Sequence, residues 1–174
     1  MTTPEELKRY VRDVPDYPQK GIVFRDITPL LGDKRIFEEV VELMSKPWLD
    51  NPPDLVAGIE ARGFIPGAAI SVRLGAGFVP IRKTGKLPWM TVVESYDLEY
   101  GTDQLEVHSD AVQPGQKVLI VDDVLATGGT ASAAVRLMRK LGADVVGVQV
   151  LIELGYLDGR QKLQDVKLVS EILY

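Results

Sequence analysis

The 174-residue sequence contains no cysteine and only one histidine, His108. The lack of cysteine excludes disulfides, thiolate catalysis and cysteine-based metal sites. A Ser-His-Asp system or a two-histidine metal site would have to rest on His108, which we interpret as a surface residue. Acid–base chemistry must therefore fall to carboxylates, lysines, tyrosines or water.

Signals of several other protein classes are also missing. No run of 18 apolar residues occurs and the N-terminus has no signal-peptide pattern, so we expect neither a membrane span nor export. A Walker A loop is absent, and Pro80 stands where the third glycine of a dinucleotide fingerprint belongs. The formal net charge of −5 argues against general nucleic-acid binding. These absences favour a cytoplasmic protein without nucleic-acid or membrane partners.

Buried strands alternate with helices along the chain. A capping box at Thr3–Glu6 predicts a short helix through about Tyr10, and residues 14–32 are rich in proline and glycine and are expected to be irregular. The alternation predicts one α/β domain over residues 1–174, with a doubly wound, mostly parallel sheet. Apolar runs predict strands at 55–59, 78–81, 118–121, 145–152 and 166–169, and helical spacing predicts helices around 37–44, at 66–74 and from 131 to a glycine cap at 142.

The most specific motif is Val118–Thr130. Four apolar residues lead into the carboxylates Asp122 and Asp123, which are costly to bury without a partner such as ribose hydroxyls or a hydrated metal. The turn that follows has small side chains and opens a helix, where free N–H groups and the helix dipole favour a phosphate. Its residues are Ala126, Thr127, Gly128, Gly129 and Thr130.

Two further charged turns follow predicted strands. Leu55–Ile59 runs into Glu60, Ala61 and Arg62, and a planar guanidinium at such a strand end is suited to gripping pyrophosphate. The strand at 78–81 runs into Arg82, Lys83 and Lys86, three cations in an otherwise acidic chain. We expect this loop to close over a polyanion and to exclude water.

Together these motifs resemble the type I phosphoribosyltransferase family. Val118–Thr130 resembles its phosphoribosyl-pyrophosphate motif, while Glu60–Phe64 and Ser95–Gly101 are similar to patterns of its adenine-specific members. The resemblance implies the fold of that family, with a small N-terminal hood at about 14–32 and a flexible lid loop at about 82–106. The lid departs from many relatives at Trp89 and Met90, a difference expected to affect packing and not chemistry.

The resemblance also implies a reaction, in which adenine and 5-phosphoribosyl 1-pyrophosphate give AMP and pyrophosphate with Mg²⁺ as cofactor. It places the metal mainly on substrate and water oxygens near Asp122 and Asp123. It also implies a homodimer. By the same resemblance, Glu99 handles the purine proton, Tyr100 packs near the reacting centre, Arg62 and the lid cations stabilise pyrophosphate, and Val23, Phe24, Arg25 and Leu157 surround the base.

Two alternatives remain open at this level. One is a phosphoribosyltransferase for xanthine, guanine or orotate, against which the hood sequence Phe24–Asp26 and the Leu98–Gly101 segment argue. The other is a ligand-sensing regulator built on the same fold. The hood begins by about Val14, which leaves no room for a winged helix, and the chain keeps Glu99.

Overall fold

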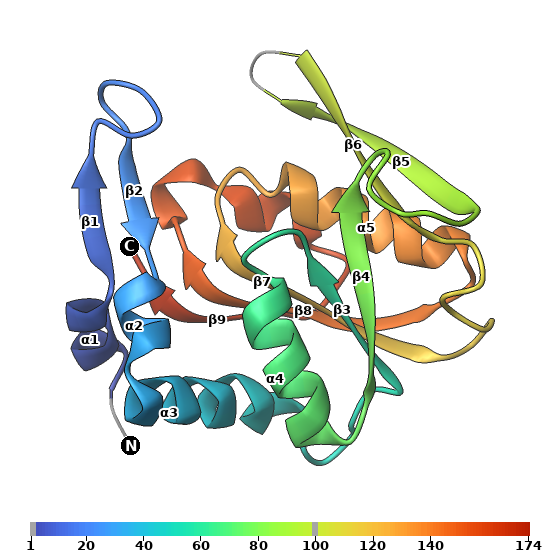
Figure 1. The fold of residues 1–174 in the computed structure, drawn as a ribbon, viewed down its shortest axis with the longest axis horizontal. Coiled ribbons are helices and arrows are strands. Elements are labelled where there is room, and N and C mark those ends of the chain that lie inside the picture. Colours follow the sequence, from blue (N-terminus) through green and yellow to red (C-terminus); the bar gives the residue numbers. More distant parts are fainter. Residues whose placement is uncertain (1–2, 99–100) are drawn as a thin grey trace.

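The computed structural model describes residues 3–98 and 101–174 (Figure 1). Its helices are α1 (Pro4–Leu7), α2 (Thr28–Gly32), α3 (Lys34–Ser45), α4 (Phe64–Leu74) and α5 (Gly129–Lys140), with short 3₁₀ turns η1 (Lys8–Tyr10), η2 (Lys46–Trp48), η3 (Gly155–Leu157) and η4 (Gly159–Leu163). Its strands are β1 (Arg12–Pro15), β2 (Val23–Asp26), β3 (Leu55–Ile59), β4 (Gly77–Lys83), β5 (Thr91–Leu98), β6 (Gly101–His108), β7 (Lys117–Leu125), β8 (Asp144–Glu153) and β9 (Leu168–Leu173).

A seven-stranded sheet with the order β5-β6-β4-β3-β7-β8-β9 forms the centre of the molecule. The five strands from β4 to β9 in this order are parallel, and β6 and β5 add an antiparallel edge. The prediction of a doubly wound, mostly parallel α/β sheet is therefore confirmed. Strands β1 and β2 form a separate antiparallel pair.

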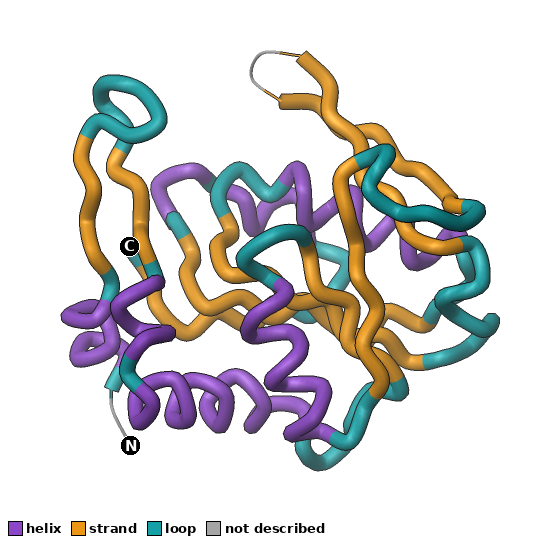
Figure 2. The backbone as a smooth tube through the Cα atoms, viewed as in Figure 1, coloured by secondary structure: helices purple, strands orange, loops and turns teal. Residues whose placement is uncertain are grey.

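Helices cover both faces of the sheet (Figure 2). Alternate residues of β7 point to opposite faces, as expected for a buried central strand. Leu119 and Val121 belong to the core formed with α3 and α4, whereas Val118 and Ile120 belong to the core formed with α5. The continuous apolar run that predicted this strand thus reflects burial on both sides.

Helices α4 and α5 end as their glycines predict. Gly75 and Gly142 have φ values of +68° and +84°, a left-handed conformation that favours glycine. The N–H groups of Ala76 and Ala143 donate back to Ser71 and Met138, which satisfies carbonyls left free at each helix end. Helix α4 begins at Phe64, two residues before the predicted start.

Two expectations about secondary structure were wrong, and one hairpin was not predicted. Residues 14–32 are irregular only in part, because β1 and β2 pair from Arg12–Asp26 to Pro15–Val23 and α2 follows them. The last strand is Leu168–Leu173, shifted toward the C-terminus from the predicted 166–169. The hairpin β5–β6 was not predicted, because its strands do not form continuous apolar runs.

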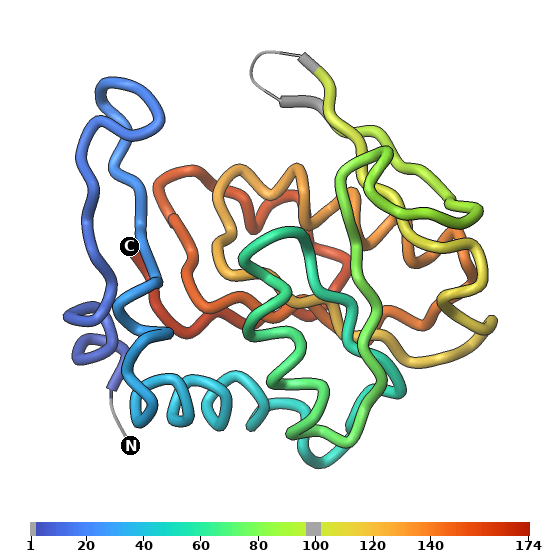
Figure 3. The backbone as a smooth tube through the Cα atoms, viewed as in Figure 1, coloured from blue at the N-terminus to red at the C-terminus, as the bar shows by residue number. Residues whose placement is uncertain are grey.

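The two hairpins rise on opposite sides of the edge where β3, β4 and β7 end (Figure 1). Figure 3 shows the C-terminus beside the β1–β2 hairpin. Its last residue, Tyr174, lies under the Arg25 guanidinium, 3.9 Å from ring centroid to Cζ. In the described part of the chain, every helix is too short or too polar to cross a membrane.

Candidate active site

A cleft of about 380 Å³ opens at the carboxyl ends of β3 and β7, where parallel α/β sheets bind their ligands. Eight of the residues predicted for substrate binding line it. The remaining lining side chains, Ile59 and Val124, belong to the ends of the same two strands. The eight predicted residues are Glu60, Ala61, Arg62, Lys83, Asp122, Asp123, Ala126 and Thr130.

Asp122 and Asp123 form an acid pair near the end of β7. Asp123 is buried, with 4% of its surface exposed, and Asp122 is half-buried. Burial and the neighbouring Asp123 carboxylate raise the pKa of Asp122 well above its usual range. Burial also raises the pKa of Asp123, although Arg62 opposes this shift. Both carboxylates would gain from hydroxyl donors or positive charge in the cleft.

Arg62 connects this acid pair to the β1–β2 hairpin. Its Nε lies 2.8 Å from Asp123 Oδ2, and its Nη1 donates to the Arg25 carbonyl at 3.2 Å. Its Cζ lies 4.5 Å from the centroid of the Phe24 ring. One side chain therefore contacts both the acid pair and the segment predicted to hold the base.

The turn between β7 and α5 forms a hollow of about 80 Å³, which is lined by residues between Asp122 and Ala131. Gly128 is the N-cap residue of α5 with φ +77°, and as a glycine it has no side chain to cap the helix. A Cβ at Gly128 would lie 2.3 Å from the Gly159 carbonyl oxygen, so η4 packs directly on the turn. The free N–H groups of the first helical turn make this hollow suited to a phosphate.

Two carboxylates hold the cations at the end of β4 and in the turn after it. Glu60 accepts from Arg82 Nη2 at 2.8 Å and from Arg82 Nε at 3.1 Å, and it also accepts from the Lys83 N–H at 3.0 Å. These contacts, led by the Arg82 hydrogen bonds, lower the pKa of Glu60. Lys86 is exposed, and its N–H donates to Glu106 at 2.9 Å.

Lys83 lies between the cleft and the β5–β6 hairpin. Its Nζ donates to Tyr96 Oη at 2.6 Å and pairs with the Asp103 carboxylate. Although burial alone would lower it, these contacts raise the pKa of Lys83. The ammonium is therefore charged at the rim of the cleft.

Other predicted site residues lie around this cleft without lining it. Val23, Phe24 and Arg25 form β2, and Phe24 packs edge-on against Tyr17 with centroids 5.3 Å apart. Leu157 is 39% exposed at the end of η3, two residues before the glycine that packs on the phosphate turn. Glu99 and Tyr100 lie outside the described residues.

Sequence reasoning missed three residues that organise the site. Tyr96 and Asp103 hold Lys83, and buried Glu106 holds the turn that carries Lys86. Glu106 had no local feature that distinguished it from other glutamates nearby. The signal that finds it is the β4–β6 register, which sets Glu106 directly opposite Arg82.

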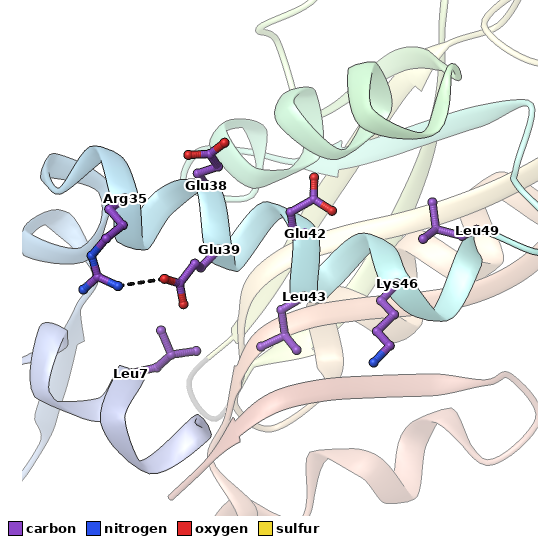
Figure 4. A pocket seen from close by; sticks show the side chains of 8 residues that line it. All are labelled: Leu7, Arg35, Glu38, Glu39, Glu42, Leu43, Lys46 and Leu49. Atoms are coloured by element: carbon purple, nitrogen blue, oxygen red, sulfur yellow. Dashed lines mark hydrogen bonds and ion pairs between the residues drawn. The ribbon is translucent and has the colours of Figure 1, made fainter. Parts of the chain in front are cut away.

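A separate hollow of about 490 Å³ lies beside α3 (Figure 4). Its lining includes Glu38, Glu39 and Glu42 from α3, and Glu39 accepts from Arg35 at 2.7 Å. Figure 1 places α3 away from the carboxyl ends of β3 and β7, and the three glutamates outnumber the two cations in the lining, Arg35 and Lys46. The chemistry described above therefore belongs to the cleft at β3 and β7.

The residues of the cleft fit a divalent cation that binds together with the substrate, and not one held by protein side chains alone. Among residues 3–98 and 101–174, no group of three or more histidines, aspartates or glutamates is arranged to hold a metal ion. Mg²⁺ commonly binds through one or two carboxylates together with substrate phosphates and water. The adjacent carboxylates of Asp122 and Asp123, with their raised pKa values, fit that mode.

Comparison with known proteins agrees with this geometry. The family described as "Phosphoribosyl transferase domain" matches residues 30–172. The chain is 62% identical over 162 residues to an adenine phosphoribosyltransferase of Thermobifida fusca, covering 93% of this chain and 92% of that protein.

Solved structures show the same relationship. The adenine phosphoribosyltransferase of Thermoanaerobacter pseudethanolicus superimposes with a TM-score of 0.96 at 50% identity, covering 99% of this chain and all of that chain. The Saccharomyces cerevisiae enzyme, solved with an imino-altritol bisphosphate and adenine, has a TM-score of 0.91 at 35% identity and coverage of 97% and 98%. The chain thus has the type I phosphoribosyltransferase fold and belongs to the adenine phosphoribosyltransferase family, the pentosyltransferases of purine salvage.

Proposed function

We propose that this protein transfers the phosphoribosyl group of 5-phosphoribosyl 1-pyrophosphate to adenine, releasing AMP and pyrophosphate. The observation that carries this substrate assignment is the single cleft that joins the acid pair, Arg62 and the phosphate-suited turn. This substrate has a hydroxyl-bearing ribose between a 5′-phosphate and a pyrophosphate at C1. The cleft has matching chemistry in the same order.

In the reaction, the adenine nitrogen forms a bond to the anomeric carbon while the bond to pyrophosphate breaks. Positive charge develops on the ribose ring, and the carboxylates of Asp122 and Asp123 accept hydrogen bonds from its hydroxyls and supply negative potential. The turn Ala126–Thr130 binds the 5′-phosphate through backbone N–H groups. Arg62 and the lysines Lys83 and Lys86 stabilise the departing pyrophosphate, with Arg82 holding the segment that carries both lysines.

The base binds between the hood and the segment after β8. Phe24 offers an aromatic face, Val23 and Arg25 offer backbone groups, and Leu157 offers an apolar side chain. Glu99 takes the proton that adenine loses, and Tyr100 packs near the reacting centre. Mg²⁺ would be held near Asp122 and Asp123, where it neutralises pyrophosphate charge and orients the substrate.

We also propose that the protein is a homodimer. An apolar stripe runs along α4 at helical spacing, and Ile65 and Val72 on it are 43% and 83% exposed. Ala68 is exposed and Ala69 is half-buried on the same stripe. Sedimentation of the purified protein at micromolar concentration tests this, with Val72→Glu as the variant expected to release monomers.

The cytoplasm is the proposed site of action, in keeping with a chain that contains no cysteine. The test of the reaction itself is the release of pyrophosphate from 5-phosphoribosyl 1-pyrophosphate in the presence of Mg²⁺ and adenine. Release that depends on adenine supports the assignment. Pyrophosphate release at the same rate with and without adenine would reject the assignment.

A further inference from the structure

Glu106 is a buried carboxylate outside the cleft that holds the turn after β4. It lies on β6 between β4 and β5, and only 3% of its surface is exposed. Its Oε1 accepts from the N–H groups of Lys86 and Leu87, both at 2.9 Å. One oxygen thus fixes two consecutive peptide groups of the turn.

The turn that Glu106 holds also contacts Arg82. The Lys86 carbonyl accepts from Arg82 Nη1 at 3.0 Å, and the same guanidinium grips Glu60 at the floor of the cleft. The described contacts therefore run without a break from Glu106 through Lys86 and Arg82 to Glu60. Both ends of the cation-bearing segment 82–87 are held by carboxylates.

The physical cost of burying Glu106 indicates what it does. A buried carboxylate is unfavourable unless several donors satisfy it. Although burial raises it, hydrogen bonds from the N–H groups of Leu87, Gly85 and Lys86 bring the pKa of Glu106 below its usual value. Thr84, Gly85 and Lys86 are themselves exposed, so few packing contacts are available to order them.

We propose that Glu106 is a positioning residue for pyrophosphate binding: its carboxylate orders the turn Thr84–Leu87 and thereby aims Lys86 and Arg82. Glu106 does not touch the substrate, and its effect passes through the backbone of the turn. This role rests on the proposed function, because it assumes that the cations bind a pyrophosphate.

Three variants of Glu106 separate acceptor geometry from charge. Glu106→Gln keeps an oxygen at the same reach without the charge, and Glu106→Asp keeps the charge but shortens the side chain. Glu106→Ala removes both. Binding of Mg²⁺–pyrophosphate by calorimetry is the primary readout, and the KM values for 5-phosphoribosyl 1-pyrophosphate and adenine are the second.

We expect Glu106→Ala and Glu106→Asp to weaken pyrophosphate binding roughly tenfold, since ordered donors and cations lose their alignment. Glu106→Gln should stay within about threefold of the original protein, and KM for adenine should change less than about twofold in all three. If charge alone matters, the order reverses, with Gln severe and Asp mild, and the positioning role is overturned. Should Glu106→Ala fail to fold, the Gln and Asp pair still decides.

A double-mutant cycle tests the route through the turn. Lys86→Ala keeps the backbone N–H but removes the ammonium, so adding Glu106→Asp to it should cost little further pyrophosphate affinity. Fully additive losses would overturn the route. Glu171→Ala, a partly buried carboxylate on the distant strand β9, is the matched control and should leave pyrophosphate binding unchanged.

The two levels of failure are distinguishable. If the unmodified protein makes no AMP from adenine and 5-phosphoribosyl 1-pyrophosphate, the proposed function fails. If it makes AMP and all three Glu106 variants bind pyrophosphate as it does, only the role of Glu106 fails.

Discussion

Arg62 pairs with Asp123 across the floor of the cleft, with Nε 2.8 Å from Oδ2. Asp123 is almost fully buried, whereas the Arg62 side chain remains 35% exposed. The pair thus joins an interior charge to a cation that solvent and substrate can reach. Because Arg62 also donates to the Arg25 carbonyl, this one side chain connects the pyrophosphate end of the cleft to the hood.

Arg62→Ala should weaken pyrophosphate inhibition and destabilise the fold. Removing the guanidinium leaves Asp123 buried without its ion pair, a loss of about 1–3 kcal/mol. Denaturant unfolding and inhibition by pyrophosphate measure the two effects. Arg139→Ala breaks an exposed ion pair with Asp165, neither residue of which lines the cleft, and should alter neither. Unchanged inhibition in Arg62→Ala would remove this residue from the pyrophosphate site.

Gly128→Ala should damage the phosphate turn by a clash as well as by backbone strain. Its Cβ would approach the Gly159 carbonyl oxygen to 2.3 Å, and its φ is +77°. Gly115→Ala is the matched control, because Gly115 has φ +85° but open space around it. The control should lose only about 1 kcal/mol of folding free energy. Gly128→Ala should lose more, and its KM for 5-phosphoribosyl 1-pyrophosphate should rise, whereas equal behaviour of the two variants would contradict the packing of η4 on this turn.

Glu171 should make the protein less stable as pH rises. Burial raises the pKa of Glu171, so its ionisation costs more in the folded than in the unfolded state, and the cost grows above the unfolded value of about 4.3. Glu171→Gln should therefore melt higher than the original protein at pH 8, with a smaller difference at pH 4.

The contribution of Glu153 to stability has the opposite pH dependence, so Glu153 serves as the control for Glu171. The hydrogen bond from Arg160 lowers the pKa of Glu153, so its contribution to stability is present above about pH 4.3 and is lost as pH falls through the folded pKa. Glu153→Gln should thus lower the melting temperature at pH 8 and matter less in acid. Parallel pH trends in the two variants would refute one of the two assignments, and the sign of the trend would show which.

Glu99→Gln should reduce turnover and leave binding of 5-phosphoribosyl 1-pyrophosphate nearly intact. A glutamine can hold a hydrogen bond to the purine but cannot accept its proton, and general base catalysis contributes roughly 10²–10⁴-fold. Single-turnover kinetics with adenine measures the loss, and calorimetry measures binding. Turnover equal to that of the original protein would take Glu99 out of the mechanism.

Elements buried on both faces were predictable from the sequence. Leu55–Ile59 has the predicted bounds, because a strand covered on both sides is apolar at every position. The strand at 118–121 was found but extends to Leu125, since its last residues alternate between the core and the cleft. Asp122 and Asp123 therefore lie within the strand and not beyond it.

Strands whose burial or pairing depends on residues far along the chain escaped prediction. In β6, buried Leu105 and Val107 flank Glu106, whose burial depends on N–H donors from a turn some twenty residues earlier. The hairpin β1–β2 likewise depends on pairing across a segment rich in glycine and proline. Such long-range partners leave no local pattern, which is also why Tyr96 and Asp103 were missed.

The central claim is tested most directly by supplying the protein with 5-phosphoribosyl 1-pyrophosphate, Mg²⁺ and one base at a time: adenine, hypoxanthine, guanine, xanthine or orotate. Pyrophosphate and the nucleoside monophosphate are then quantified together. We predict equimolar AMP and pyrophosphate with adenine and no turnover with the other four bases. Turnover with another base in place of adenine, or none with any base while the sugar pyrophosphate still binds, would contradict the account.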